Sequence, residues 1–385
     1  MSKFDVAVVG GGVIGASIAF ELEAEKLRVV VLDRQQPGRE ASWAAAGMLS
    51  PAPDSLRDIP LVPLGRESLA LYPQFVAAIE EGSGKSTAYA REGTLEFLFA
   101  PQGEAQRDRK VSEYHQLGLA AEPIPIGAAR QWEKSIGPDA RAAVALPEEG
   151  TVEPRLLMEA VLAAARRRGV EIRPDCRVTG LLRERKRCVG VVAGGEEIAA
   201  GYVVAAAGWF SGEIVPDMEI LARYAPTRPV RGQMLALRPD SLGLRRVLRS
   251  ERGYLVPRRD GRVVAGSTTE EAGFEKRVTP EGMRKILDAA LELCPSLARA
   301  EIVETWSGLR PGTPDDLPIL GPTDIEGLLI ATGHYRNGIL LAPVTAKLVR
   351  EWIVNGRTDF DAAAFSPLRF SQRELKPRSA AQRGD

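Results

Sequence analysis

The stretch FDVAVVGGGVIGASIAFELEAE, residues 4–25, decides the fold of the N-terminal part of the chain. Its Val-rich start is a short apolar run that predicts a fully buried strand, and the residues after the glycines follow a helical period. LRVVVLDR, residues 27–34, predicts a second buried strand. Strand, helix and strand in this order form a β-α-β unit, which implies a parallel sheet.

Three glycines, Gly10, Gly12 and Gly15, form G-x-G-x-x-G directly between the first strand and the helix. Glycines there permit a tight turn and a close approach of the backbone to a pyrophosphate, which rests on the helix N-terminus. Asp33 ends the second strand about 20 residues further on, where an acid can hydrogen-bond a ribose hydroxyl. The pattern predicts a dinucleotide site but leaves FAD and NAD both open. A glycine-rich turn without a ligand is the alternative.

Further helices and short strands follow along the chain. We expect the short strands between residues 170 and 268 to form antiparallel sheet, with a hairpin turn at Asp260 and Gly261. Thr279 is the expected N-cap of one helix. Helical periodicity and end signals predict helices over 63–82, 154–168, 280–294 and from Asn337 to 354.

Composition bounds the function. The 385 residues suit two or three domains, and the 51 basic and 51 acidic residues cancel, so no electrostatic footprint for nucleic acid or an anionic membrane is present. Three scattered cysteines (Cys176, Cys188 and Cys294) form no CxxC pair, which favours a reducing compartment and excludes a zinc or disulfide framework. Neither a signal peptide nor a transmembrane segment is recognisable, and we expect a cytoplasmic protein.

EASWAAAGMLSP, residues 40–51, follows the second strand. Small residues in a row let backbone amides pack against a flat ligand. A tight helix contact explains the same composition, so the residues alone leave both open.

Seven motifs in order resemble the D-amino acid oxidase superfamily of flavoproteins, and within it the glycine oxidases of bacterial thiamine biosynthesis. The resemblance covers nearly the whole chain. Besides the dinucleotide motif, it is carried by SWAAAGMLSP (42–51), EEGTVEPRLLMEA (148–160), VVAAAGWFSG (203–212), YLVPRRDGRVVAGST (254–268), WSGLRPGTPDDLPILG (306–321) and GHYRNGILLAP (333–343).

The resemblance implies an α/β protein, α+β overall, in two domains. A Rossmann-like FAD-binding domain with a parallel sheet is expected over 1–80, 145–225 and 305–367. A substrate-binding domain with an antiparallel sheet is expected over 81–144 and 226–304, and 368–385 is expected to be a polar tail.

It also implies non-covalent FAD, because no cysteine lies in the C-terminal flavin segment. Asp33 and Arg34 would meet the adenosine end of the cofactor. The full set of implied cofactor-binding residues is Gly10, Gly12, Val13, Ile14, Gly15, Asp33, Arg34, Ala41, Ser42, Ala46, Gly47, Met48, Val178, Gly208, Trp209, His334, Arg336, Asn337, Gly338, Ile339 and Leu340.

For the substrate, the resemblance implies Arg310, Tyr254 and Arg336. The planar fork of Arg310 suits a carboxylate, although a salt bridge with Asp315 or Asp316 would also explain it. Tyr254 is alternatively explained by packing within a sheet. Thr269 and Arg252 depart from the glycine-oxidase pattern and put side-chain selectivity in doubt.

The chemistry expected at this site requires no side-chain acid or base, because a neutral amine gives a hydride from its Cα to the flavin. His334 is therefore interpreted as a structural or cofactor-contact residue, and His115 as a surface residue. Asn337 and Gly338 begin a helix whose N-terminus would stabilise negative charge on the reduced flavin. Pro343 is tolerated if it falls in the first turn of that helix.

We therefore expect FAD-dependent oxidation of glycine and other small amines or D-amino acids, with oxygen reduced to hydrogen peroxide. A D-amino acid dehydrogenase and a sarcosine oxidase-like enzyme are the alternatives among flavoenzymes. An NAD-dependent dehydrogenase and a non-catalytic nucleotide-binding module are the alternatives outside them. The expected partners are a small amino acid substrate, molecular oxygen and further copies of the chain, since the resemblance implies a homo-oligomer, with a tetramer among the possible forms. Nucleic acid, membrane and metal are not expected.

Overall fold

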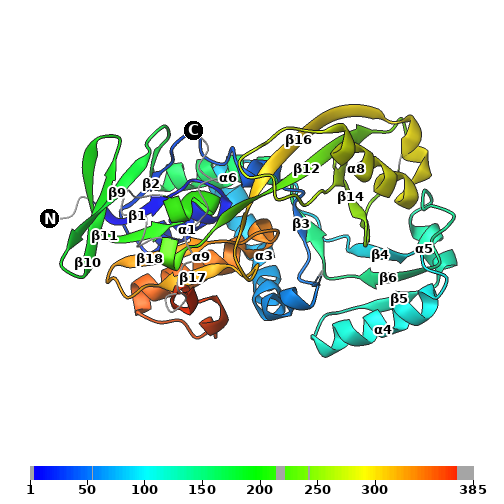
Figure 1. Ribbon diagram of the computed structural model, residues 1–385, viewed down its shortest axis with the longest axis horizontal. Helices are drawn as coiled ribbons and strands as arrows, with labels where there is room; N and C mark the ends of the chain where they lie inside the picture. Colours follow the sequence, from blue (N-terminus) through cyan, green and yellow to red (C-terminus); the bar gives the residue numbers. More distant parts are fainter. Residues whose placement is uncertain (1–3, 54, 214–221, 242, 371–385) are drawn as a thin grey trace.

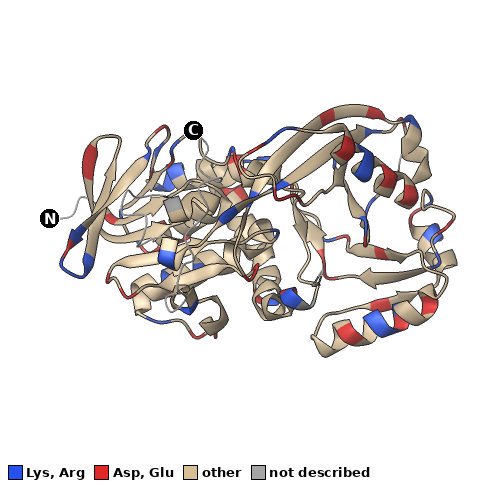
Figure 2. Ribbon diagram, viewed as in Figure 1, with Lys and Arg blue, Asp and Glu red and all other residues tan. Residues whose placement is uncertain are grey.

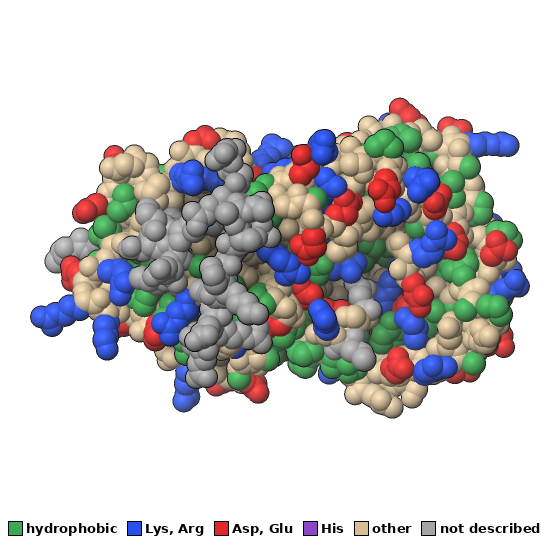
Figure 3. All heavy atoms as spheres, viewed as in Figure 1, with side chains coloured by type: hydrophobic (Ala, Val, Ile, Leu, Met, Phe, Trp, Pro, Cys, Tyr) green, Lys and Arg blue, Asp and Glu red, His purple; other side chains and the backbone are tan. Residues whose placement is uncertain are grey.

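The computed structural model describes residues 4–53, 55–213, 222–241 and 243–370. The molecule is elongated, with one large sheet toward each end (Figure 1). Acidic and basic residues are interspersed along the ribbon of both parts in Figure 2, and the face seen in Figure 3 carries side chains of both signs side by side. No field of one sign covers that face.

The first sheet is built on the β-α-β unit predicted from residues 4–34. Its strand β1 (Phe4–Val9) pairs in parallel with β2 (Val29–Leu32) on one side and with β11 (Glu196–Ala205) on the other. The predicted parallel sheet is therefore confirmed. Beyond these strands it continues in parallel to β8 (Glu171–Arg173) and β18 (Leu328–Thr332), and β17 (Ile319–Pro322) joins β18 antiparallel.

Both faces of this sheet are covered. Val6 and Val8 of β1 belong to a core shared with the helices, whereas Ala7 and Val9 point to the other face and pack on an antiparallel extension of β11. Burial on both faces explains why β1 is a continuous apolar run. The helices are α1 (Val13–Ala24), α3 (Val62–Ser83), α6 (Pro154–Arg168) and α9 (Gly338–Asn355), and the extension is β9 (Val178–Glu184) with β10 (Arg187–Ala193).

The second sheet has the order β16-β12-β15-β14-β13-β4-β6-β5 and is antiparallel apart from the pair of β13 with β4. One face packs on α8 and α5, and α4 lies on the other face. The bounds are β4 Thr94–Leu98, β5 Glu122–Ile124, β6 Ala142–Leu146, β12 Arg228–Arg238, β13 Val247–Ser250, β14 Gly253–Pro257, β15 Val263–Gly266, β16 Glu301–Gly312, α4 Gly103–Gln116, α5 Ile126–Trp132 and α8 Pro280–Leu293.

Short elements join the two parts. The helix α2 (Ala41–Ala44) packs on β16, and β3 (Met48–Leu49) pairs with β7 (Gly150–Thr151). The 3-10 helix η2 (Gly208–Glu213) follows β11, and η1, η3, η4 and η5 span Leu56–Leu61, Pro295–Arg299, Ala363–Phe365 and Pro367–Phe370.

Three sequence-based expectations need correction. The strand β8 and residues 200–205 of β11 pair in the parallel sheet, whereas residues 196–199 of β11 pair antiparallel with β10 as expected, because a short apolar run shows burial but not the direction of its partner. The expected domain borders at 144/145 and 304/305 fall inside β6 and β16. The expected tail begins too early, since Phe370 is buried in η5; residues 371–385 lie outside the described residues.

Candidate functional site

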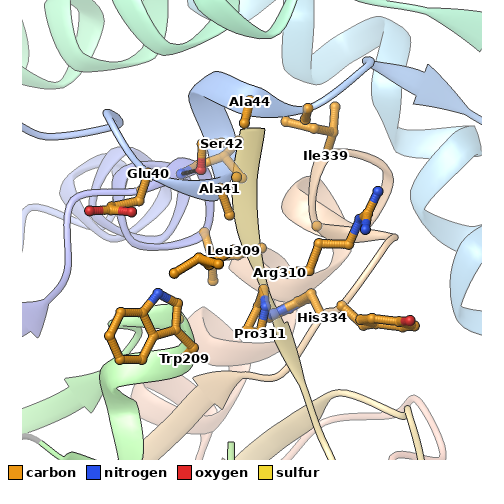
Figure 4. Close-up of a pocket in the computed structure, with 18 of the residues that line it drawn as sticks. Glu40, Ala41, Ser42, Ala44, Trp209, Leu309, Arg310, Pro311, His334 and Ile339 are labelled. Atoms are coloured by element: carbon orange, nitrogen blue, oxygen red, sulfur yellow. Dashed lines mark hydrogen bonds between the residues drawn. The ribbon is translucent and has the colours of Figure 1, made fainter. Parts of the chain in front are cut away.

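One cavity is lined by both parts of the molecule, from Val9 of β1 and Leu32 of β2 to Met234 of β12 and Tyr254 of β14. Every residue that the sequence implied for cofactor or substrate lines it, apart from Gly15 and Leu340. Figure 4 shows α2, with Ala41, Ser42 and Ala44, next to β16, with Leu309, Arg310 and Pro311; Trp209 and Ile339 lie to the left and right of them in that view.

Asp33 holds the glycine loop. Its Oδ2 accepts a hydrogen bond of 2.7 Å from the Gly11 amide, and burial raises the pKa of its carboxyl group. Gly10 adopts a φ of 104°, and a Cβ there would lie 2.6 Å from the Ala206 carbonyl oxygen. Gly15 is a packing residue: its Cβ would lie 1.9 Å from the Gly10 carbonyl oxygen, so it lets α1 approach the loop without itself lining the cavity.

The small residues after β2 make the tight helix contact that was one of the two interpretations, and they also line the cavity. The Ser42 hydroxyl accepts a 2.9 Å hydrogen bond from the Val13 amide at the start of α1. Ala44 packs closely on β16: a Cβ added to Gly308 would lie 2.5 Å from the Cβ of Ala44. The Trp306 indole also donates a hydrogen bond of 3.1 Å to the Ala44 carbonyl oxygen. The segment is therefore a tight helix contact and a wall of the cavity at once.

Arg310 lies on β16, where the opposite strand leaves it room. A Cβ on Gly232 would lie 2.3 Å from the Arg310 guanidinium. The guanidinium donates to the Ser267 hydroxyl at 2.8 Å and to the Thr268 carbonyl at 3.0 Å. The suspected acidic partners are engaged by other arginines: Asp315 pairs with Arg369 at 2.9 Å and Asp316 pairs with Arg228 at 3.4 Å.

Tyr254 lies on β14 with its hydroxyl 3.6 Å from the sulfur of Met234, and both residues line the cavity. It is thus both a sheet residue and a cavity residue. Arg336 is exposed at the opposite rim. Thr269 and Arg252 do not line the cavity, and Arg252 forms an ion pair with Glu292 at 3.1 Å.

His334 is 3% exposed, and its Nε2 lies 3.0 Å from the Thr345 hydroxyl of α9. Burial lowers the pKa of His334 to about 3, so the ring is neutral at neutral pH. A neutral, enclosed imidazole bonded to a hydroxyl suits the structural interpretation of this residue.

The helix α9 begins after Asn337, as predicted, and Asn337, Gly338 and Ile339 line the cavity. The first turn of a helix leaves amides without intrahelical acceptors, so this end of the cavity suits negative charge. Leu340 instead faces a small separate cavity behind the first turn.

Pro343 lies in the second turn of α9, not in the first. Proline has no N–H for the Ile339 carbonyl, and the Tyr72 hydroxyl of α3 donates to that oxygen at 2.8 Å. The next backbone pair of the helix, the Leu340 carbonyl and the Val344 amide, is bridged by Ser68. Its hydroxyl donates to the Leu340 carbonyl at 2.5 Å and accepts from the Val344 amide at 3.3 Å. Side chains of α3 thus supply hydrogen bonds to the backbone of α9 where Pro343 interrupts its pattern.

Sequence reasoning missed several cavity residues. Ser267 and Tyr335 flank Arg310 in the cavity. Both stand inside recognised motifs, 254–268 and 333–343, so their polar side chains could have been proposed as cavity residues from the sequence. Arg249 and Ser50 also line the cavity, and nothing in the local sequence singled them out.

The residues present fit a flavin dinucleotide. The Trp209 Nε1 atom is buried and has no hydrogen-bond partner among the described residues, and Trp209 lines the cavity. Nearby, the Arg34 guanidinium lies 3.1 Å from the centre of the Phe210 ring and pairs with Glu40 at 3.0 Å. A glycine loop, a helix N-terminus and an unused indole donor are a donor set for phosphate and ring polar atoms.

Two features are absent from the described part of the chain. It contains no helix of the length and apolarity needed to cross a membrane. Over those same residues, His, Cys, Asp and Glu form no group of three that could hold a metal ion.

Known proteins are similar over nearly the whole chain. A family model described as "FAD dependent oxidoreductase" (DAO) matches residues 5–352. The glycine oxidase of Pseudomonas putida is 32% identical over 95% of this chain and 99% of its own length. A solved glycine oxidase from Geobacillus kaustophilus has a TM-score of 0.88 at 31% identity, covering 96% of this chain and 99% of that one.

A longer relative extends beyond this chain. The bifunctional protein ThiO/ThiG of Trichormus variabilis is 38% identical over 96% of this chain. The chain spans 55% of that relative and about half of two others of the same name.

Proposed function

Because the chain belongs to the DAO family of FAD-dependent oxidoreductases, we propose that it oxidises glycine and other small amines or D-amino acids, with oxygen reduced to hydrogen peroxide. FAD is the cofactor of this family and supplies the hydride acceptor. The substrate would lose a hydride from Cα and become an imine, which water converts to an oxo acid and ammonia. Similarity to ThiO/ThiG supports a place in thiamine biosynthesis.

The observation that carries this proposal is that Arg310, on the strand β16 of the second sheet, lines the same cavity as the glycine loop. There its guanidinium, held by Ser267 and the Thr268 carbonyl, would bind the substrate carboxylate, with Tyr254 as a second polar contact. Arg336 at the rim would complete the substrate site. These residues need only bind and orient a neutral amine, because no proton has to be removed from carbon.

The cofactor assignment is proposed for the implied residues that line the cavity. Asp33 and Val178 would lie at the adenosine end, Gly12 and Ser42 near the pyrophosphate, and Ile339 at the flavin edge. We also propose non-covalent binding, a homo-oligomer, a cytoplasmic location and the two-domain division with its borders moved outside β6 and β16. The three free cysteines, two of them buried, support a reducing compartment.

The test is a panel of glycine, sarcosine, D-alanine and D-proline, with oxygen uptake and peroxide measured together. We expect peroxide in amounts equal to the oxygen consumed, with glycine among the good substrates. Turnover that needs a dye or quinone and gives no peroxide would instead establish a dehydrogenase. Preference for sarcosine over glycine would establish the sarcosine oxidase-like alternative.

A further inference from the structure

A row of residues crosses the face of the second sheet that borders the cavity. Register pairs Glu96 of β4 with Arg249 of β13, Arg249 with Tyr254 of β14, and Tyr254 with Gly266 of β15. Residues paired in register share one face of a sheet. Arg249 therefore lies beside Tyr254 in the wall of the same cavity.

Arg249 is buried and held from several sides. Its guanidinium donates to Glu96 at 2.8 and 3.3 Å, to the Tyr114 hydroxyl at 3.1 Å and to the Ser50 hydroxyl at 2.9 Å. Glu96 is further paired with Lys110. Burial opposes the charges, but the attraction of Arg249 and Lys110 lowers the pKa of Glu96 to about 2.

One donor of Arg249 is left over. A guanidinium has five N–H groups. Nε and Nη2 use theirs on Glu96 and Tyr114, and Nη1 uses one on Ser50. The Oε1 atom of Glu149 lies 3.9 Å from Nη1, beyond hydrogen-bond distance. Among the described residues, none accepts the second N–H of Nη1.

The charged groups around Arg249 are also compatible with a ligand oxygen at this place. Arg249 and Lys110 face Glu96 and Glu149, and the Ser50 hydroxyl donates to Glu149 at 2.5 Å. Burial raises the pKa of Glu149, and its Oε2 has no partner among the described residues. Burial thus favours the neutral form of Glu149, which repels a ligand oxygen less than a carboxylate would.

We propose that the second N–H of Arg249 Nη1, beside Ser50 in the cavity wall, forms a second polar subsite, which takes a carboxylate or carbonyl oxygen of a substrate whose other end binds Arg310. The favoured substrates are then small amines or D-amino acids with such an oxygen, and glycine would leave the subsite to water. The inference rests on the proposed function, since it assumes that the substrate carboxylate binds Arg310.

Binding to the oxidised holoenzyme tests this subsite without turnover. Succinate, succinamate and butyrate are titrated while the flavin absorbance is followed; the three share one carboxylate and differ at the other end. We expect succinate and succinamate to bind about tenfold more tightly than butyrate, the effect of one hydrogen bond with a charged partner. Equal affinity for all three would overturn the proposal, and a preference for succinate alone would restrict it to carboxylates.

Variants separate recognition from structure. Arg249→Met removes the donor, and Arg249→Met with Glu96→Gln removes it without leaving a buried carboxylate. We expect either protein to lose the preference while its affinity for butyrate changes less than about threefold. Equal loss for all three ligands would show a structural role and refute the subsite.

Arg252→Met is the matched control. Arg252 lies at the exposed turn between β13 and β14, outside the cavity, so its replacement should preserve the preference. If the enzyme produces no peroxide with any amine but still prefers succinate, the proposed function fails and the subsite stands. D-aspartate and D-asparagine compared with D-alanine extend the test to turnover.

Discussion

Arg310 depends on a residue that has no side chain. The strand β12 passes behind it at Gly232, and a Cβ there would overlap the guanidinium. Replacing Gly232 with alanine should displace the guanidinium and raise the KM for glycine at least about tenfold, while FAD binding is retained. Arg310→Lys should have a similar effect, because an ammonium group cannot bind both carboxylate oxygens.

Gly127→Ala is the control for that substitution, since no atom lies within 4 Å of a Cβ built there. Steady-state kinetics and the flavin content of the purified proteins decide the outcome. A KM for glycine unchanged in Gly232→Ala would show that the guanidinium is not where the substrate carboxylate binds.

His334 gives a prediction on pH. Its folded pKa of about 3 lies below the ordinary value of 6.5, so the unfolded state binds the proton more readily. Stability from this residue is complete above pH 6.5 and is lost as the pH falls toward 3. Between pH 7.5 and 5, the wild type should lose about 2 kcal/mol more unfolding free energy than His334→Gln.

Urea unfolding of the two holoenzymes at both pH values measures this difference. Turnover of His334→Gln should keep the pH profile of the wild type between pH 6 and 9, since a neutral ring transfers no proton. A change in that profile would restore His334 as a candidate acid or base.

At the scale of the elements, the helix α9 depends on hydrogen bonds from side chains of another helix, α3. The Tyr72 hydroxyl replaces the N–H that Pro343 lacks. Tyr72→Phe should therefore leave the Ile339 carbonyl unsatisfied and lower the unfolding free energy by about 1–3 kcal/mol. In the Tyr72→Phe background, Pro343→Ala should recover much of this loss, because alanine supplies the missing donor.

A double-mutant cycle with denaturant unfolding measures the coupling of Tyr72 and Pro343. Additive effects of the two substitutions would contradict the inference that the Tyr72 hydroxyl compensates for the N–H that Pro343 lacks. Absorbance of the bound flavin reports in parallel whether the first turn of α9 has moved.

The sequence predicted elements well where the signal was local. The strand β1 and helix α1 follow from one apolar run and one glycine motif, and Thr279 caps α8 as expected, accepting from the Gly282 amide at 3.2 Å. Pairing was not local. Residues 196–205 alternate in burial at one end and are fully buried at the other, since β11 leaves the antiparallel extension to enter the parallel sheet.

The site was predicted as far as motifs reach. Arg310 and the glycine loop stand in recognisable patterns, but Arg249 reaches the cavity through the register of three strands. Such a juxtaposition cannot be found from spacing along the chain. The tolerance of Pro343 in the second turn could not be predicted for a similar reason, since the compensating hydroxyl comes from Tyr72, a residue far away in sequence.

At the scale of the molecule, the cavity joins the two sheets, so the cofactor should couple their stabilities. A ligand that binds the folded state alone stabilises it by about 4 kcal/mol at a thousandfold excess over its Kd. Removal of FAD should therefore lower the Tm clearly, and added FAD should restore it in a concentration-dependent way. Differential scanning calorimetry measures this; the same Tm with and without FAD would show that the folded protein does not bind the cofactor preferentially.

The strand order of the first sheet also bears on synthesis at the ribosome. The glycine loop is translated first, but β1 cannot pair with β11 until residues 196–205 have been made. The strand β11 in turn cannot pair with β18 until residues 328–332 have been made. The cavity is closed by residues 334–339, which emerge later still. A nascent chain thus displays its nucleotide motif long before it can retain a nucleotide, and we expect the cofactor to be captured only after residues 334–339 have emerged.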